Sequence, residues 1–139
     1  MIDKNQLKQE MIAWRHDIHQ HPEAAFEEVR TAKFAADKLR AFGYEVTENV
    51  GKTGVVGVLK NGDGPVIGLR SDIDANKIIE TGDVPYKSQT EQRMHACGHD
   101  GHAATLLGAA KLIADERLSR ARSSWCSSRR KNRAGARTP

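Results

Sequence analysis

Residues 94–114 read MHACGHDGHAATLLGAAKLIA, and this stretch joins a cluster of metal-binding residue types to a helix. The cluster holds one thiol and three imidazoles: Cys97, His95, His99 and His102. Apolar residues then recur at the spacing of one helix face, which predicts a helix over residues 102–116. A functional site at the mouth of a helix is therefore the first hypothesis for this chain.

The segments before this stretch predict two helices and three strands. Apolar spacing predicts amphipathic helices over residues 4–20 and 27–42, and short apolar runs predict strands over residues 44–50, 54–60 and 65–74. The turn sequence NGDG at 61–64 predicts that the last two strands form an antiparallel hairpin. Residues 75–93 read as a long polar loop. Helices interleaved with strands indicate a layered α/β fold.

Composition bounds the class of protein. A length of 139 residues fits one domain, and no apolar run approaches the length of a membrane span. The polar N-terminus does not resemble a signal peptide. The two cysteines, Cys97 and Cys126, lie far apart and form no CxxC pair, so we expect a cytoplasmic protein with no membrane partner.

The positive charge is confined to the end of the chain. Residues 119–139 hold six arginines and one lysine and no acidic residue, whereas residues 1–118 carry a net charge of −3 (15 basic against 18 acidic residues). A basic tail of this kind raises the hypothesis of a nucleic-acid-binding module, but aromatic residues are not interleaved with the basic ones and no nucleic-acid-binding motif is present.

Two interpretations of the cluster are open from the residues alone. If Cys97-Gly98-His99 is extended, its thiol and imidazole project to one side, where they suit zinc, cobalt, nickel or manganese. Asp72 and Asp74 leave the preceding strand on one face and could support such a site. Alternatively, Cys97 is a small buried apolar residue and His99 a polar residue at a helix start.

The histidines near the N-terminus receive a simpler interpretation. His16 and His19 lie three residues apart on the first helix, and His21 precedes Pro22. We expect them to lie at a solvated helix end, and Asp17 to be a surface charge.

Three segments in order, RHDIHQHPEAAFEE, GLRSDIDA and MHACGHDGHAATLLGAAKLIA, resemble successive signatures of the N-acyl-amino-acid amidohydrolases. This group lies within metallopeptidase family twenty and includes hippurate hydrolase, aminoacylase-like bacterial enzymes and plant auxin-conjugate hydrolases. The resemblance covers about residues 10–117. It implies the truncated N-terminal portion of a zinc-peptidase-like α/β catalytic domain, with helices packed on a mixed sheet.

The resemblance also implies a site. Cys97 and His99 match two metal ligands of a two-metal centre, which holds zinc, manganese, cobalt or nickel. Asp74 matches the acidic residue of related carboxypeptidases that supports the metal site. Four further residues lie in the motifs without an assigned role as ligand: Asp72, His95, Asp100 and His102. Asn76 and Lys77 depart from the family pattern, which has Leu-Pro after Asp-Ala.

The family pattern breaks after residue 118. The next family strand reads like GTVVLVFQPAEE and ends in a general-base and a metal-binding glutamate, whereas this chain reads SRARSSWCSSRRKNRAGARTP. Back-translation in a shifted frame makes residues 120–139 compatible with the family strand. We therefore expect residues 119–139 to be an out-of-frame, disordered tail, and the sheet of residues 1–118 to lack the next strand.

The resemblance implies a metal-dependent amidohydrolase that releases an amino acid and a carboxylic acid from a small-molecule N-acyl amino acid. The chain as written is expected to be inactive, because most of the site lies beyond the break. A dipeptidase or carboxypeptidase of the same superfamily is the alternative. No nucleic-acid partner is expected, and an exposed sheet edge favours a homo-oligomer over a stable monomer.

Overall fold

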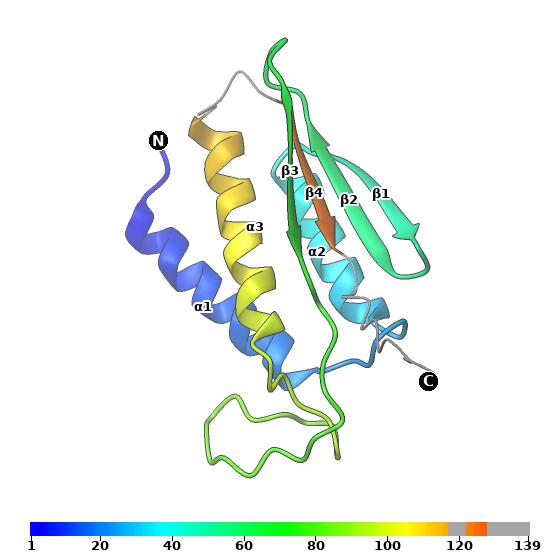
Figure 1. The fold of residues 1–139 in the computed structure, drawn as a ribbon. Coiled ribbons are helices and arrows are strands. Elements are labelled where there is room, and N and C mark those ends of the chain that lie inside the picture. The colour runs from blue at the N-terminus through cyan, green and yellow to red at the C-terminus, as the bar shows by residue number, and fades with distance from the viewer. Residues whose placement is uncertain (117–121, 128–139) are drawn as a thin grey trace, which may run out of the picture.

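Figure 1 shows the computed structural model, which describes residues 1–116 and 122–127. Three helices and four strands follow one another along the chain: α1 (Lys4–Gln20), α2 (Val29–Ala41), β1 (Glu45–Val50), β2 (Gly54–Leu59), β3 (Val66–Ser71), α3 (His99–Glu116) and β4 (Arg122–Ser127). The predicted α/β class is confirmed, and the observed α1 has the predicted bounds. Within the described residues, none of the helices combines the length and apolar character needed to cross a membrane.

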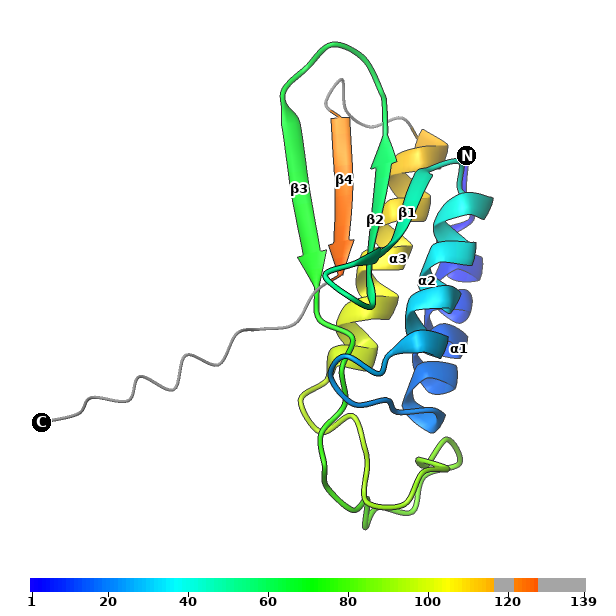
Figure 2. The ribbon, with the colours of Figure 1, turned by 90° about the vertical axis from the view of Figure 1, so that its right-hand side faces the viewer.

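The four strands form one sheet in the order β1-β2-β4-β3, with the three helices on the same side of it (Figure 2). β1 and β2 are antiparallel, β2 and β4 are antiparallel, and β3 and β4 are parallel, so the sheet is mixed as expected. α2 packs on β1 and β2, α3 contacts β3, and α1 packs on α3. This packing places the N-terminal end of α3 beside the end of β3.

The two N-terminal helices follow the apolar pattern of the sequence. Asp3 caps α1, because its side chain accepts hydrogen bonds from the Asn5 and Gln6 amides at 2.8 and 3.4 Å. Helix α2 buries Ala32, Ala35, Ala36 and Leu39. Val29, which shares the apolar spacing of Ala32, Ala36 and Leu39 and was therefore expected on the same buried face, is exposed, so that expectation was wrong. Gly43 takes the positive φ of 90° expected of a helix C-terminus.

The predicted hairpin between the second and third strands was wrong. β4 lies between β2 and β3, and the observed hairpin joins β1 to β2. The turn sequence at 61–64 reverses the chain direction as expected, but the connection from Leu59 to Val66 is long enough to span the extra strand. A turn sequence predicts that the chain reverses its direction. It does not predict which strands pair, because a more distant segment such as β4 can pair with the same strand edges.

The segment expected to be disordered is a strand where the structure describes it. Arg122–Ser127 forms β4, and its backbone pairs with β2 from Val56 to Leu59 and with β3 from Val66 to Ser71. The expectation of a disordered tail was therefore wrong for these residues, because two flanking edges offer backbone partners to any extended segment. The expectation that the sheet lacks its next strand is wrong for the same reason. The rest of the expected tail lies outside the described residues.

Candidate metal centre

The residues expected to form the site meet at one end of the molecule. Strand β3 ends at Ser71, and the chain continues through Asp72 and Asp74 into the loop 75–93, which confirms the predicted loop. The chain then returns through residues 94–98 and enters α3 at His99 rather than at the predicted residue 102. The end of a β-strand facing a helix N-terminus is a frequent place for ligand sites in α/β folds.

Asp74 and His99 are in direct contact. The Nδ1 atom of His99 lies 2.8 Å from the Asp74 carbonyl oxygen and 3.1 Å from the Asp74 carboxylate. An Nδ1–H that donates to these oxygens leaves Nε2 of His99 with its lone pair available. A ligating histidine oriented in this way by a carboxylate is a common feature of metal sites.

Cys97 is exposed and lies in a turn rather than in an extended segment. Gly98 has a φ of 79°, a region that favours glycine, and its carbonyl oxygen accepts the His102 amide at 3.0 Å as α3 begins. The predicted extended geometry of residues 97–99 was therefore wrong. The positive φ reverses the chain into the helix, and this reversal sets where the thiol lies relative to the imidazole.

Asn76 links the segment that follows β3 to residues 94–97, which precede α3. Its backbone pairs with Met94 in both directions, at 2.9 and 3.1 Å, and its side-chain oxygen accepts the Cys97 amide at 3.2 Å. Asp74 and Asn76 thus contact His99 and Cys97 respectively from positions two residues apart. The departure from the family pattern at residue 76 places a hydrogen-bond acceptor beside the candidate ligand.

The chemistry of these side chains fits part of a transition-metal site. A thiolate and an imidazole are suitable donors for zinc, cobalt or nickel, and Asp74 supplies the supporting carboxylate. Among residues 1–116 and 122–127, no group of three or more histidine, cysteine or acidic residues has an arrangement that could hold a metal ion. The described chain therefore offers two candidate donors and their support, which is less than a complete coordination sphere.

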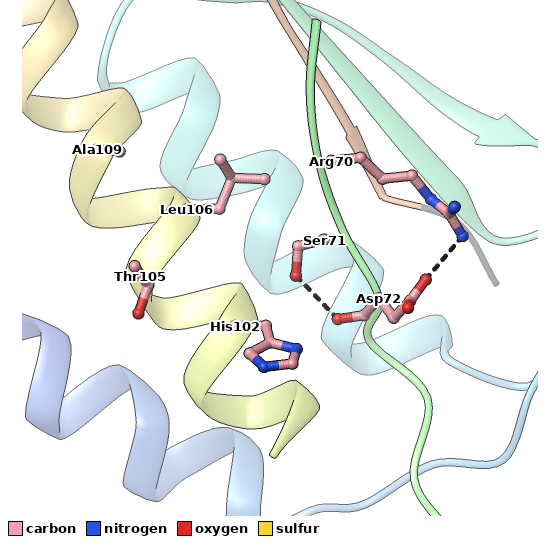
Figure 3. A pocket seen from close by; sticks show the side chains of 7 residues that line it. All are labelled: Arg70, Ser71, Asp72, His102, Thr105, Leu106 and Ala109. Atoms are coloured by element: carbon pink, nitrogen blue, oxygen red, sulfur yellow. Dashed lines mark hydrogen bonds and ion pairs between the residues drawn. The ribbon is translucent and has the colours of Figure 1, made fainter. Parts of the chain in front are cut away.

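A pocket of about 490 Å³ opens next to this region, between β3 and α3 (Figure 3). Asp72 does not join Asp74 in supporting His99: its carboxylate turns toward Arg70 and pairs with it at 2.7 Å. His102 projects from α3 toward the strand, and its ring centroid lies 5.7 Å from that of His99. With Leu106 and Thr105 on the helix side, the lining is partly apolar and partly polar.

A buried network of charges lies behind the candidate donors, and the sequence interpretation missed it. His19 is 5% exposed, and its Nδ1 lies 2.9 Å from the Asp100 carboxylate while its Nε2 lies 3.0 Å from the Glu80 carboxylate. Arg15 also reaches Asp100, at 3.2 Å. The expected solvated position was wrong for His19, because α1 packs that side chain against α3 and the loop. The sequence near His19 could not indicate this position, because its partners Glu80 and Asp100 lie 61 and 81 residues away.

The neighbouring histidines of α1 differ from His19. The His16 ring stacks on Tyr86 of the loop at a centroid distance of 3.8 Å and is only partly buried. His21 lies at the helix end as expected, where its Nδ1 bonds to the Asp17 carbonyl oxygen at 2.7 Å. Asp17 is a surface charge as expected, and it pairs with Arg30 at 2.8 Å. Of these three histidines, His19 alone is fully buried and lies between two carboxylates.

The pKa values of two buried histidines, His19 and its neighbour His95, shift in opposite directions. Burial lowers the pKa of His19, but hydrogen bonds and charges from Glu80 and Asp100 raise it more, so its net pKa lies above the ordinary value. Burial lowers the pKa of His95 to about 4, against the opposing charge of Asp100. Both ring nitrogens of His95 and one Asp100 carboxylate oxygen are buried without a hydrogen-bond partner among the described residues.

Comparison with known proteins places this geometry in a class. The solved structure of the Bacillus subtilis YXEP protein, described as a dinuclear metal binding peptidase from the M20 family, matches with a TM-score of 0.84 and 36% identity, over 90% of this chain and 36% of that chain. The fold is thus that of a partial catalytic domain of this peptidase class.

Sequence comparison finds similarity to one peptidase family. Residues 68–123 match the model of Peptidase family M20/M25/M40. The chain is 55% identical to hippurate hydrolase of Campylobacter jejuni over 111 residues, which is 79% of this chain and 29% of that protein. It is 44% identical to thermostable carboxypeptidase 2 of Saccharolobus solfataricus over 113 residues, 80% of this chain and 29% of that protein. The chain is homologous to the M20 family and spans less than a third of the length of these two relatives.

Proposed function

We propose that this chain is the N-terminal part of a metal-dependent amidohydrolase that splits N-acyl amino acids into a carboxylic acid and an amino acid. The observation that carries the proposal is the contact between Asp74 and His99 beside Cys97, at the end of β3. The 55% identity to a hippurate hydrolase supports this substrate class, because hippurate is an N-acyl amino acid.

The residues on this chain have distinct roles in the proposal. Cys97 Sγ and His99 Nε2 are the proposed metal donors, and Asp74 holds the His99 ring through Nδ1. A divalent metal ion, when bound, makes water a stronger nucleophile and polarises a carbonyl oxygen. The pocket between β3 and α3 offers Leu106 to an apolar acyl group and His102 to a polar group of the substrate.

We propose further that the chain as written does not hydrolyse amides. The resemblance places the proton-transferring glutamate beyond residue 118, where this sequence has serine and arginine instead. General acid–base catalysis contributes about 10²–10⁴ in rate, and a metal held by two donors is held weakly. Arginines in that segment would also repel a dication.

The test compares the 139-residue chain with the product of the gene after the reading frame is restored near Ser119. Both are assayed on hippurate with added zinc, manganese or cobalt. We expect turnover by the restored product alone, and we expect Cys97→Ala to abolish it. Turnover by the 139-residue chain that disappears in Cys97→Ala would refute the proposed inactivity. An inactive restored product with tightly bound metal would count against the amidohydrolase assignment.

A carboxypeptidase is the second candidate, favoured by the 44% identity to thermostable carboxypeptidase 2. The same restored product separates the two by its relative kcat/KM on hippurate and on an unblocked dipeptide. A preference for the dipeptide would favour the second candidate.

The proposed setting is cytoplasmic, since reducing conditions keep an exposed thiol such as that of Cys97 free for metal binding. We propose no nucleic-acid or membrane partner. Binding of the chain to duplex DNA with a steep salt dependence would contradict this part of the proposal.

A further inference from the structure

His19 connects three segments that are far apart in sequence. It projects from α1, while Asp100 follows His99 in the first turn of α3 and Glu80 belongs to the loop that continues from Asp74. Its two ring nitrogens contact one carboxylate on each side, at 2.9 and 3.0 Å. A single side chain therefore bridges the two segments that carry the candidate metal-site residues.

Every side chain of the bridge is buried and takes part in at least one hydrogen bond. The side chains of His19 and Glu80 are each 7% exposed, and that of Asp100 is fully buried. The other oxygen of Glu80 accepts the Ser88 amide at 2.7 Å, so the same carboxylate closes the loop on itself. Two carboxylates accepting from one imidazole require both ring nitrogens to carry protons, which makes His19 an imidazolium.

A second set of contacts ties the loop to the same helix. The Gln89 amide donates to the Gln20 carbonyl oxygen at 2.9 Å, and Tyr86 stacks on His16. The loop is thus held in its first third by His19, through Glu80, and nearer its far end by Gln20. Of these contacts, the His19 bridge alone also reaches α3.

We propose that His19 is a positioning residue for the candidate metal site: by joining Asp100 to Glu80 it fixes the helix turn that carries His99 against the loop that follows Asp74. This inference rests on the proposed metal site. Loss of the bridge frees the α3 turn and the loop to move separately, and the Asp74–His99 contact then no longer orients the ring. Residues that orient metal ligands typically contribute about ten- to a hundredfold in metal affinity.

The experiment uses the full 139-residue chain and cobalt(II), whose absorption reports a bound thiolate. His19→Gln keeps size and polarity but can serve only one carboxylate. His16→Gln is the matched control, since it makes the same change three residues away on α1 and removes a loop contact, the stacking on Tyr86, that does not involve Asp100 or Glu80. Glu80→Ala removes the loop half of the bridge, together with the acceptor of the Ser88 amide, and leaves the contact between His19 and Asp100, which keeps the test decisive if His19→Gln does not fold. Circular dichroism establishes that each variant is folded.

We expect His19→Gln to raise the cobalt Kd about tenfold or more and to alter the visible cobalt bands, with Glu80→Ala in the same direction and His16→Gln unchanged. Amide exchange at Ser88 and His102 is expected to speed up in His19→Gln, because these amides lie on either side of the bridge. A merely structural role would lower the melting temperature without changing the cobalt bands of the folded variant.

Two results would overturn the inference, and they are distinguishable. A wild-type thiolate–cobalt band with the same Kd and spectrum in folded His19→Gln and Glu80→Ala would remove the positioning role and leave the metal site standing. Absence of that band from the wild-type chain, with a spectrum identical to Cys97→Ala, would overturn the proposed metal site and this inference with it.

Discussion

Asp74 and His99, 25 residues apart in sequence, are joined at the same ring nitrogen by a backbone and a side-chain oxygen of one residue. This double contact specifies which nitrogen of His99 carries the proton and which way the ring faces. These contacts with Asp74 orient the His99 ring without the help of a metal ion.

The first prediction concerns Asp74. Asp74→Ala removes the carboxylate contact while the carbonyl contact stays, so we expect cobalt affinity to fall about tenfold or more. Asp72→Ala is the control, because its carboxylate pairs with Arg70 and not with His99. Cobalt titration followed by absorption makes the measurement, and equal loss in both variants would contradict a specific role for Asp74.

The second prediction concerns Gly98, whose φ of 79° is strained for any other residue. Gly98→Ala should cost about 1–3 kcal/mol in the free energy of unfolding and weaken cobalt binding, because the turn between Cys97 and His99 must relax. Space is not the cause, since an added Cβ would meet nothing within 4 Å. Gly82→Ala, also in open space but without a positive φ, is the control in urea unfolding. A loss as large in that control would remove the explanation by strain.

The third prediction is a pH dependence of stability that belongs to His19. Because the folded pKa of His19 lies above its ordinary value of 6.5, its contribution is fully present below about pH 6 and is lost as the pH rises through the folded pKa. His19→Gln should therefore destabilise the chain more at about pH 5.5 than at about pH 8.5. Thermal melts of both chains at each pH provide the measurement.

Other ionisable and aromatic groups also face His19. Comparing the wild type with His19→Gln at each pH cancels most of what these groups contribute to the pH dependence of stability. Arg15 pairs with Asp100, the His95 ring centroid lies 6.3 Å from that of His19, and Tyr86 meets His19 edge-on at 5.4 Å. The low pKa of His95 makes folding less favourable as the pH falls below 6.5. Burial, the largest cause of that shift, is shared by the wild type and the variant, whereas the smaller contribution from the charge of His19 is absent from the variant. A difference between the two chains that grows with rising pH would contradict the assignment to His19.

The fourth prediction concerns the edge of the sheet. β3 pairs with β4 on one side, and its other side has no strand partner within the described residues. Val66, Ile67 and Leu69 on this strand are exposed. We expect concentration-dependent self-association, reduced by Ile67→Lys and unaffected by Ile12→Lys, an exposed isoleucine on α1. Sedimentation velocity tests this, and a monodisperse wild-type monomer would contradict it.

The fifth prediction concerns Asn76, which departs from the leucine of the family pattern. Asn76→Leu removes the acceptor for the Cys97 amide, so we expect a few-fold weaker cobalt binding, in line with about 1 kcal/mol for one hydrogen bond. Lys77→Ala, next in sequence and exposed, is the control. Tighter binding in Asn76→Leu would show that the family residue serves the site better.

Sequence periodicity predicted the helices well because their buried faces are local patterns. Leu7, Trp14 and Ile18 are all buried in α1, as their spacing predicts. Asp74 and His99 were predicted as parts of one site through the family resemblance, and the structure brings them into contact. Neither their shared contact nor the backbone of the turn at Gly98 follows from residue spacing.

The errors share a physical cause, which is dependence on distant segments. The hairpin prediction used only the turn at 61–64 and could not include β4, which pairs on both sides from a position more than fifty residues further on. The role of His19 depends on carboxylates 61 and 81 residues away. The residues around a histidine at a helix end do not indicate whether its side chain is buried or exposed.

The sheet order also constrains when the fold can form during synthesis. Among the described strands, β3 joins β2 through β4, and β4 is the last of these four strands to leave the ribosome. Before residues 122–127 emerge, β1 and β2 can pair as a hairpin, but β3 must wait on α3 without a strand neighbour. Pairing across so long a stretch of chain is slow, since the loop must close before its contacts contribute. A change of sequence at residues 122–127 therefore acts after β1, β2, β3 and α3 have been synthesised, and it decides whether the three earlier strands join one sheet or remain a hairpin beside a lone strand.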